Sequence, residues 1–475
     1  MRILEGLKPE KVFEYFEEIS AIPRGSGKTD KIRDYCVDFA KQRNLEYVAD
    51  EAGNVVIFKS ACGKETSETV IIQGHLDMVW EKDETCKINF ETDGLELGVD
   101  GDYVFAHGTT LGGDNGIAVA MGLALLDADN IKHPPLEIVF TADEEVGMTG
   151  AGGLDTSVLK GKRMINLDSE AEGVLWVSCA GGVRADVSFD TEYEENRKNT
   201  FEINVSGLHG GHSGAEIHNG YANANKVMGR VLAELREKGS YGICDIGGGT
   251  ADNAITRDSK CVVASDIDIC KAVAEISEKI ADDYKAADPN IVISAAPCEK
   301  AEKRMTADST KTVVDVLNEL PSGVIAMSKE IDGLVETSLN IGVLKNENGK
   351  VSYCFAVRSS KDGERDKLSD MLRRIAEKHS CNITFSSPYP AWEFKPDSTL
   401  RETMANVYRE MYGKNMTVTA IHAGLECGLF CGKIKGLDCV SLGPDMFDIH
   451  SPKERLSISS SERVWNYLLR VLETI

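Results

Sequence analysis

The sequence predicts an α/β protein whose first domain is interrupted by an inserted α+β domain. The length of 475 residues is more than one hydrophobic core normally serves. Over the first 180 residues, short apolar runs rich in β-branched residues alternate with helical segments, which is typical of a mixed, largely parallel sheet covered by helices. Beyond about Gly182, polar and apolar residues alternate, as they do in half-exposed strands.

The first domain is expected to contain four strands and a buried helix before the insertion begins. The strands are the short apolar runs at residues 55–59, 69–73, 136–142 and 163–167. Residues 116–126 are apolar on every face, as in a helix buried between layers. Residues 1–20 predict an acidic amphipathic helix, and they lack both the apolar stretch and the cleavage site of a signal peptide.

The rest of the chain is expected to complete the insertion and then return to the first domain. The insertion should contain strands at 183–194, 200–207 and 261–270, a helix at 222–238, and a strand–helix–strand unit at 351–360, 367–378 and 382–386. After the Pro- and Ser-rich residues 386–398, we expect a helix at 399–412, a strand at 437–442 and a helix at 461–472. The predicted partition is 1–182 and 393–475 for the first domain and 183–392 for the inserted one.

Composition excludes several classes of partner. The formal net charge is −24, with 77 acidic and 53 basic residues, so a polyanion such as nucleic acid would be repelled. No apolar run approaches the roughly 18 residues of a membrane span. Thirteen cysteines without paired spacing suit reduced thiols. We therefore expect a cytoplasmic protein with neither nucleic acid nor membrane as a partner.

Histidine and carboxylate side chains follow the ends of the predicted strands. In open α/β sheets, the functional crevice lies beyond the carboxyl ends of the strands. The residues are His75 and Asp77, Glu144 and Glu145, Asp168, His450 in the loop after the strand at 437–442, and Asp114 at the start of the buried helix. Because they come from separate segments to one edge of the sheet, these residues predict a metal site.

This set of residues suits two divalent cations. Imidazole and carboxylate ligands favour zinc, with cobalt or manganese as alternatives. Five ligands with one shared carboxylate can hold two ions, and three carboxylates would then leave a net charge of about +1, which favours ionising a bridging water. Asp77 has the spacing to orient His75, and Glu144 would be the general base.

Five motifs carry a resemblance to a known family. They are HLDMV, GGDNG, TADEEVGMTGA, NLDSE and IHSP. In order and spacing they resemble the dinuclear zinc peptidases related to aminoacylase and carnosinase, over nearly the whole chain. Within that family the chain most resembles the aminoacyl-histidine dipeptidases (Xaa-His dipeptidases, also called cytosol non-specific dipeptidases). The resemblance implies hydrolysis of Xaa-His and other unblocked dipeptides by a metal-bridging hydroxide, in a protein for which a homodimer is one possible assembly.

The resemblance also implies a role for each residue of the motifs. Asp114 would be the carboxylate shared by two metals. One metal would have His75 and Asp168 as its further ligands, and the other would have Glu145 and His450. Asp77 would orient His75, and Glu144 would be the catalytic base.

The inserted domain corresponds in this resemblance to a lid or dimerisation domain that also binds substrate. In GLHGGHSG, His212 would hydrogen-bond the developing oxyanion. Asn253 and Arg358 would bind the substrate and its carboxylate. The segment HAGLECG would supply His422 and Glu426, the latter as a partner for a free amino terminus.

Two alternatives remain open at this point. The same chemistry would serve a deacylase or a tripeptidase. A non-catalytic metal-binding protein on an enzyme-derived fold would have lost the base or a ligand, and here all are present. The preferred second residue of the substrate, the metal in the cell, and whether His212 acts in its own chain or across a dimer are not readable from the sequence.

Overall fold

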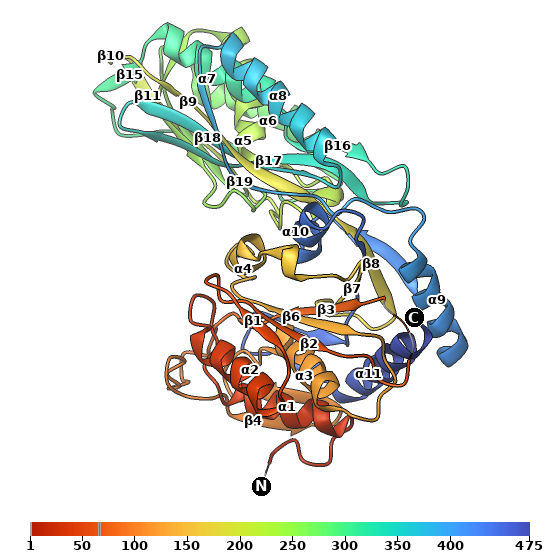
Figure 1. Ribbon diagram of the computed structural model, residues 1–475. Coiled ribbons are helices and arrows are strands. Elements are labelled where there is room, and N and C mark those ends of the chain that lie inside the picture. Colours follow the sequence, from red (N-terminus) through yellow and green to blue (C-terminus); the bar gives the residue numbers. More distant parts are fainter. Residues whose placement is uncertain (1, 65, 67) are drawn as a thin grey trace. The chain divides into compact units, whose positions relative to one another are not determined.

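The chain forms two compact units. The computed structural model describes residues 2–64, 66 and 68–475 (Figure 1). Unit 1 comprises the chain up to Ser178 together with Phe394–Ala420 and Leu425–Ile475, and unit 2 comprises Cys179–Glu393 and Ile421–Gly424. The predicted junctions at 182/183 and 392/393 lie close to these boundaries. The predicted partition places residues 421–424 in the first domain, whereas the N–H of Ala180 donates to the carbonyls of Ile421 and Ala423 and joins this segment to unit 2.

Unit 1 is built on an eight-stranded mixed sheet. Its strand order is β1-β2-β6-β3-β7-β21-β8-β20. The strands are β1 (Tyr47–Ala49), β2 (Val55–Lys59), β3 (Val70–His75), β6 (Leu136–Thr141), β7 (Arg163–Asn166), β8 (Val174–Cys179), β20 (Thr417–Ile421) and β21 (Asp438–Ser441). The central strands β6, β3, β7 and β21 run parallel, while β1, β2 and β8 pair antiparallel with their neighbours. This confirms the predicted mixed, largely parallel sheet.

Helices cover both faces of this sheet. They are α1 (Glu10–Ser20), α2 (Asp30–Gln42), α3 (Gly113–Asp127), α4 (Thr149–Gly153), α9 (Thr399–Tyr412), α10 (Glu426–Lys433) and α11 (Ile458–Thr474), with a 3₁₀ turn at Thr156–Val158. In Figure 1, α1, α3 and α11 lie on one face, and α4 and α10 lie on the other. The strands β3 and β6 are buried along their whole length because helices cover both sides of them.

The buried helix α3 packs closely against the sheet. Two glycines permit this approach: a Cβ on Gly74 of β3 would stand 2.5 Å from the Cβ of Ala118, and a Cβ on Gly122 of α3 would stand 2.8 Å from the ring of Phe140. At the other end of α3, Lys59 donates hydrogen bonds to the carbonyls of Leu125 and Leu126, which have no partner within the helix. The helix is thereby fixed against β3 and β6.

The structure corrects two of the predicted elements. The helix predicted over residues 1–20 covers only Glu10–Ser20, because Gly6 has a positive φ of 87° and Pro9 precedes the first helical turn. Met1 lies outside the described residues. The strand predicted over residues 261–270 ends at Ser265, and the Asp268 side chain caps a new helix that begins at Ile269.

A second, four-stranded antiparallel sheet belongs to unit 1. Its order is β22-β23-β5-β4. The strands are β4 (Leu97–Asp100), β5 (Tyr103–Ala106), β22 (Met446–Phe447) and β23 (Arg455–Ser457). The segment that joins β22 to β23 contains His450, so this small sheet anchors both ends of the His450 loop.

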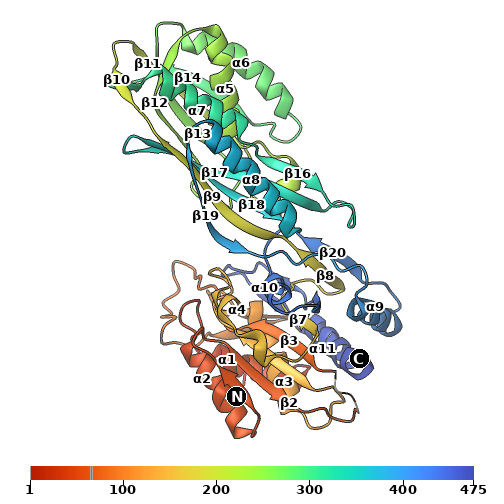
Figure 2. The ribbon, with the colours of Figure 1, turned by 45° about the horizontal axis from the view of Figure 1, so that its top comes forward.

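Unit 2 is an antiparallel sheet with helices on one face, as the α+β prediction implies. The order is β14-β11-β13-β12-β17-β18-β9-β19, with β16 also paired to β17. The strands are β9 (Gly181–Asp190), β11 (Asn199–Ser206), β12 (Tyr241–Gly248), β13 (Ser259–Ser265), β14 (Val292–Pro297), β16 (Gly323–Met327), β17 (Val335–Glu347), β18 (Lys350–Ser359) and β19 (Asn382–Tyr389), and β10 (Tyr193–Glu195) pairs with β15 (Lys303–Met305). The helices α5 (Ala224–Lys238), α6 (Ile269–Tyr284), α7 (Ala307–Glu319) and α8 (Asp362–Lys378) gather on one face of the sheet (Figure 2), and a 3₁₀ turn spans Ile217–Asn219.

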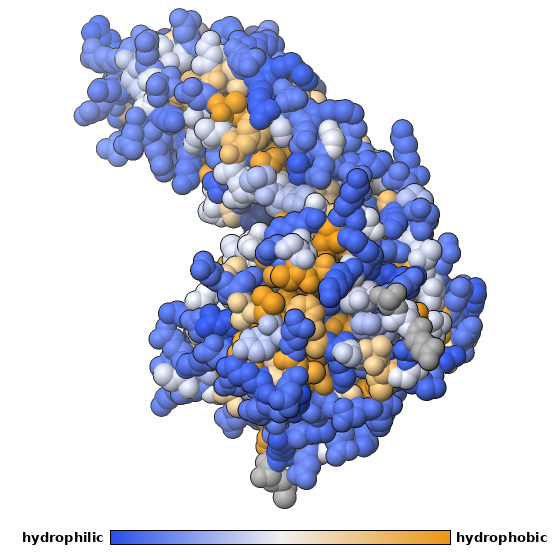
Figure 3. Space-filling model, in the orientation of Figure 1, coloured by the Kyte–Doolittle hydropathy of each residue, from blue (hydrophilic) through white to orange (hydrophobic). Residues whose placement is uncertain are grey.

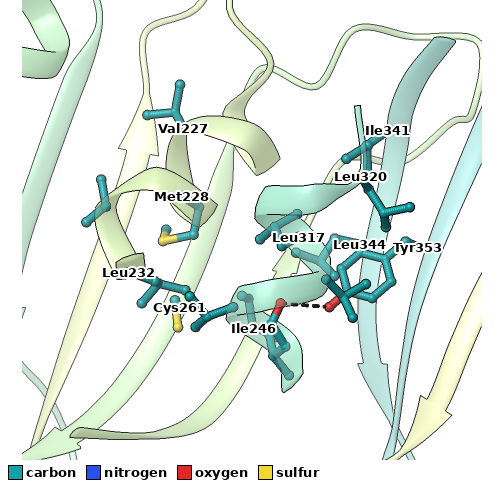
Figure 4. Close-up of a cluster of buried hydrophobic side chains, with 14 of the residues drawn as sticks. Val227, Met228, Leu232, Ile246, Cys261, Leu317, Leu320, Ile341, Leu344 and Tyr353 are labelled. Atoms are coloured by element: carbon teal, nitrogen blue, oxygen red, sulfur yellow. Dashed lines mark hydrogen bonds between the residues drawn. The ribbon is translucent and has the colours of Figure 1, made fainter. Parts of the chain in front are cut away.

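The core of unit 2 lies between these helices and the sheet. Val227, Met228 and Leu232 of α5 pack with Leu317 of α7 and with strand residues such as Ile246 (Figure 4). Tyr353 of β18 is fully buried there, and its hydroxyl donates to the carbonyl of Val313 at 3.1 Å, so its one polar atom is satisfied.

In the view of Figure 3, hydrophilic residues form most of the rim of each unit. Among the helices of the described residues, none is both long and apolar enough to cross a bilayer.

Candidate functional site

The predicted metal ligands of unit 1 meet at the carboxyl ends of the central strands. His75 is the last residue of β3, Glu144 and Glu145 follow β6, and Asp168 follows β7. Because β3, β6 and β7 run parallel, their carboxyl ends share one edge of the sheet. The prediction that these side chains converge is confirmed by their distances.

Asp114 lies at the centre of the group. Its Oδ1 is 3.2 Å from His75 Nε2, and its Oδ2 is 3.2 Å from His450 Nε2. Asp168 lies beside the first histidine, with its Oδ1 3.4 Å from His75 Nε2. Glu145 lies beside the second histidine, with its Oε1 2.9 Å from His450 Nε2.

Among the residues that the structure describes, three sets of donor atoms are close enough together to hold a cation. Within each set, the nitrogen and oxygen atoms lie within 4.8 Å of one another. The sets are His75–Asp114–Asp168, Asp114–Glu145–His450 and His75–Glu144–Glu145. The first two have the composition predicted for two neighbouring metal sites that share Asp114, and the third places the predicted base, Glu144, beside them.

Asp77 orients the surrounding groups. This fully buried carboxylate is 3.3 Å from His75 Nδ1, so that the opposite nitrogen, Nε2, faces Asp114 and Asp168. Its oxygens also accept hydrogen bonds from the backbone N–H groups of Glu144 and Glu145 at 3.0 and 3.3 Å. One carboxylate therefore fixes both the imidazole and the turn that carries the two glutamates.

The clustering of charges shifts the pKa values at this site. Burial disfavours protonation of His75, but Asp168 and the other neighbouring carboxylates outweigh it and raise its pKa well above the ordinary value. Hydrogen bonds to the carboxylates of Asp114 and Glu145 raise the pKa of His450 to about 10. Burial raises the pKa of Glu144, and the negative charges of nearby Asp168 and Glu145 raise it further.

These residues fit divalent cations by donor chemistry and by charge. Burial raises the pKa of Asp168, and the neighbouring carboxylates Asp114 and Glu145 raise it further. Within the described part of the chain, the salt bridges of Asp114, Glu145 and Asp168 are to histidine and none is to lysine or arginine. Bound cations would provide the missing positive charge, and imidazole with carboxylate is a ligand set that zinc accepts.

A separate polar cluster lies within unit 2. Gly214 touches three of the residues singled out by the sequence: a Cβ built on it would be 3.0 Å from His212 Cε1, 3.3 Å from Arg358 Nε and 2.4 Å from the carbonyl of His422. Arg358 and Ser213 are buried, and Arg358 Nε and Ser213 Oγ have no hydrogen-bond partner among the described residues. Buried polar atoms normally have partners, so this cluster has free capacity for a polar ligand.

The protonation of His212 follows from its contacts. Its Nδ1 accepts a hydrogen bond from the backbone N–H of Ala215 at 3.0 Å. Burial lowers the pKa of His212, and so does the positive charge of Arg358. The neutral ring therefore carries its proton on Nε2, which can donate a hydrogen bond. Asn253 is exposed next to this segment, and its carbonyl accepts from the N–H of Ser213.

Glu426 does not lie where the sequence-based hypothesis puts it. The hypothesis requires an accessible carboxylate for a free amino terminus, but Glu426 is fully buried in unit 1. Its Oε2 accepts from Gln73 Nε2 at 2.6 Å and from Thr141 Oγ1 at 2.7 Å. Burial raises its pKa to about 8, so it is largely neutral at pH 7. These contacts favour a structural role beneath the strand ends.

Sequence reasoning missed several residues that support the site. Asn115 links β3 to β7, because its Oδ1 accepts from the N–H of His75 at 3.1 Å and its Nδ2 donates to the carbonyl of Leu167. Arg24 and Glu454 are buried beside Asp114. The only local sign of such a residue in the sequence is the glycine pair before Asp114. A glycine-rich turn can expose successive backbone N–H groups, which favour a nearby anion such as the Glu454 carboxylate.

Comparison with known proteins identifies the family of this chain. The chain is 35% identical to the cytosol non-specific dipeptidase of Escherichia coli (strain K12), over 100% of this chain and 99% of that one. The solved structure of aminoacylhistidine dipeptidase from Vibrio alginolyticus is 36% identical, covers 99% of this chain and 98% of its own, and superposes with a TM-score of 0.94. Aminopeptidase PepT from Bacillus cereus, at 14% identity and a TM-score of 0.57 over 98% of this chain and 99% of that one, shares the fold. Residues 71–474 match the model of peptidase family M20/M25/M40. The chain therefore belongs to peptidase family M20/M25/M40.

Proposed function

We propose that this protein is a cytoplasmic metallo-dipeptidase that hydrolyses Xaa-His and a broad range of other unblocked dipeptides. The observation that carries the proposal is the placing of Asp114 between His75 and His450, at 3.2 Å from each, with a further carboxylate on either side. The names of the full-length relatives, which are dipeptidases, support the substrate class.

In this proposal two divalent cations, most simply zinc, would be held by these residues: His75, Asp114 and Asp168 would hold one ion, and Asp114, Glu145 and His450 would hold the other. Cobalt and manganese accept the same donors. The bound ions would polarise the scissile carbonyl and lower the pKa of the attacking water.

Glu144 is assigned the transfer of the proton. It accepts a proton from the attacking water as the new C–O bond forms, and it then delivers this proton to the nitrogen of the leaving amine as the peptide C–N bond breaks. Burial raises its pKa, which makes the ionised carboxylate a stronger proton acceptor than an exposed glutamate. Asp77 holds the backbone of Glu144 and the ring of His75 in position.

The cluster in unit 2 is assigned to the polar groups of the dipeptide. Arg358, with its unpartnered Nε, and His422 would bind the free carboxylate, with Asn253 as a further substrate contact. His212 would donate from Nε2 to the oxygen that becomes negative as the tetrahedral centre forms. The cytoplasm is assigned from the name of the Escherichia coli relative, and the thirteen cysteines, all free thiols, agree with it.

The test is hydrolysis of Ala-His, β-Ala-His and Leu-Gly by chelator-treated enzyme, before and after zinc or manganese is added. We expect activity to disappear with the chelator and to return with the metal. Cleavage of no dipeptide while two metals are bound would overturn the substrate class. N-acetylated dipeptides and a tripeptide distinguish the alternatives, because a deacylase would prefer the former and a tripeptidase the latter.

Glu144→Gln is the matched variant for the mechanism. It keeps the size of the side chain but removes the base, so we expect kcat to fall by about 10²–10⁴-fold with two metals still bound. The readouts are kcat and metal content by elemental analysis. Residual activity within tenfold of the wild type would contradict the role of Glu144.

A further inference from the structure

The turn that presents Asp114 is held between two buried side chains of opposite charge. The turn comprises residues 111–114, and Gly112 within it has a positive φ of 64°. Such a conformation leaves successive backbone N–H groups pointing to one side and carbonyls to the other. Because Asp114 contacts both His75 and His450, the position of this turn decides whether its two oxygens reach both histidines.

Glu454 binds the N–H side of the turn. Its Oε2 accepts from the N–H groups of Leu111 and Gly112 at 2.7 and 2.9 Å, and its Oε1 accepts from those of Gly113 and Asp114 at 2.8 and 3.3 Å. The side chain is only 2% exposed. Since Glu454 lies four residues after His450, these four hydrogen bonds also tie the His450 loop to the Asp114 turn.

Arg24 binds the carbonyl side. Its Nη2 donates to the carbonyl of Gly112, and its Nη1 donates to the carbonyls of Leu76 and Asp77 at 3.0 and 3.2 Å. The guanidinium is 1% exposed, and a Cβ on Gly112 would stand 2.5 Å from its Nη2, so the turn fits closely around it. Arg24 therefore joins the Asp114 turn to the segment that carries His75 and Asp77.

We propose that Glu454 and Arg24 are positioning residues that hold the loops of His75, Asp114 and His450 in the arrangement needed to bind two metal ions. The inference rests on the proposed function only in taking these three residues as metal ligands. A metal-ligating side chain that becomes ordered only when the ion binds lowers the affinity for the ion, because the ordering costs free energy. A side chain that is already held in place does not have this cost. Neither residue touches the reacting atoms, so their effect passes through the ligands.

The experiment compares Glu454→Gln with Glu137→Gln in the full chain. Glu137 is an equally buried carboxylate, 2% exposed, that accepts from the backbone N–H groups of Lys160 and Gly161 at 2.8 and 3.0 Å at the opposite ends of the strands. Each substitution replaces one carboxylate oxygen by an amide that cannot accept from an N–H. Both variants therefore lose buried hydrogen bonds, but only one loses them at the Asp114 turn.

Two quantities are measured on chelator-treated protein: the midpoint of urea denaturation, and zinc affinity by competition with a chromogenic chelator. We expect both variants to lose stability and only Glu454→Gln to lose zinc affinity, by about 10–100-fold, the range found when groups that orient ligands are removed. Because Asp114 is shared, the affinities of both ions should fall. Wild-type zinc affinity in Glu454→Gln, or an equal loss in Glu137→Gln, would overturn the inference.

A second variant covers the case in which Glu454→Gln does not fold. Arg24→Lys keeps the charge but replaces the guanidinium fork by a single nitrogen, which cannot serve both loops. We expect a loss of zinc affinity of at least about tenfold, and an unchanged affinity in the folded variant would refute the positioning role. Failure of the wild type to hydrolyse dipeptides would count against the proposed function alone, because the zinc affinities are measured without substrate.

Discussion

At the scale of single residues, the surroundings shift the pKa of histidine in opposite directions in the two units. In unit 1, carboxylates raise the pKa values of His75 and His450. In unit 2, burial lowers the pKa of His422 to about 3, with Arg358 and His212 as further causes. Ser338 Oγ lies 2.7 Å from His422 Nε2 and fixes the ring. Neighbouring carboxylates therefore raise the pKa of histidine in one unit, whereas burial lowers it in the other and leaves His422 neutral at pH 7.

The neutral state of His422 predicts a pH dependence. In the unfolded chain its pKa is about 6.5, so below that pH the unfolded state binds more protons than the folded one. Its contribution to the free energy of unfolding is fully present above pH 6.5 and is lost as the pH falls from about 6.5 towards 3. We expect the ¹³C-histidine NMR signal of His422, assigned by its loss in His422→Gln, to stay constant between pH 8 and 5. A titration midpoint between pH 5 and 7 would contradict the neutral, buried ring.

At the scale of elements, α3 is the helix on which the site in unit 1 depends. Its first turn presents Asp114, and its other end is fixed by Lys59. Close contact with the sheet is possible because Gly122 has no side chain: a Cβ there would meet Phe140 at 2.8 Å and Ile138 at 2.9 Å. Both neighbours are buried and have no free space to move into.

Gly122→Ala should therefore destabilise unit 1. Alanine favours a helix by up to about 1 kcal/mol relative to glycine, but overpacking of a tight core costs about 1–3 kcal/mol, so the packing effect should win. Gly363→Ala is the matched control, because Gly363 lies in α8 with nothing within 4 Å of its Cβ position. We expect the urea midpoint to fall for Gly122→Ala and to rise slightly or stay unchanged for Gly363→Ala. Equal effects of the two substitutions would show that packing at Gly122 is not limiting.

At the scale of the whole molecule, the two units have separate tasks in the proposed function. The candidate metal ligands and Glu144 all belong to unit 1, whereas His212, Arg358 and His422 belong to unit 2. Each unit has its own sheet and its own set of covering helices. Substrate affinity and metal affinity should therefore respond independently to substitutions.

Arg358→Met tests this separation. Loss of a charge-assisted hydrogen bond of about 1.5–3 kcal/mol should lower kcat/KM for dipeptides by about 10–100-fold, mainly through KM. Zinc affinity should be unchanged, and a dipeptide amide, which lacks the carboxylate, should be cleaved equally well by the variant and the wild type. The measurements are steady-state kinetics on Ala-His and its amide. An equal loss on both substrates would argue against carboxylate recognition by Arg358.

The sequence by itself determined much of the local structure and the identity of the metal-site candidates. The strand at Val55–Lys59 and the helix at Thr399–Tyr412 have the bounds that the sequence predicts, because a short apolar run rich in β-branched residues and a helix period of 3.6 are properties of the local chain. The convergence of His75 and Asp168 was also predictable, since parallel strands bring their carboxyl ends to one edge.

Only the tertiary structure decided which distant segments the buried polar side chains contact. Glu454 acts on a turn 340 residues before it, and Arg24 joins two loops that are more than 50 residues away, so neither has a local pattern. The burial of Glu426 and the place of Ile421–Gly424 in unit 2 likewise follow from contacts with distant strands. The physical reason is that hydrophobic periodicity reports which face of an element is buried, whereas the partner of a buried polar group depends on which segments the fold brings together.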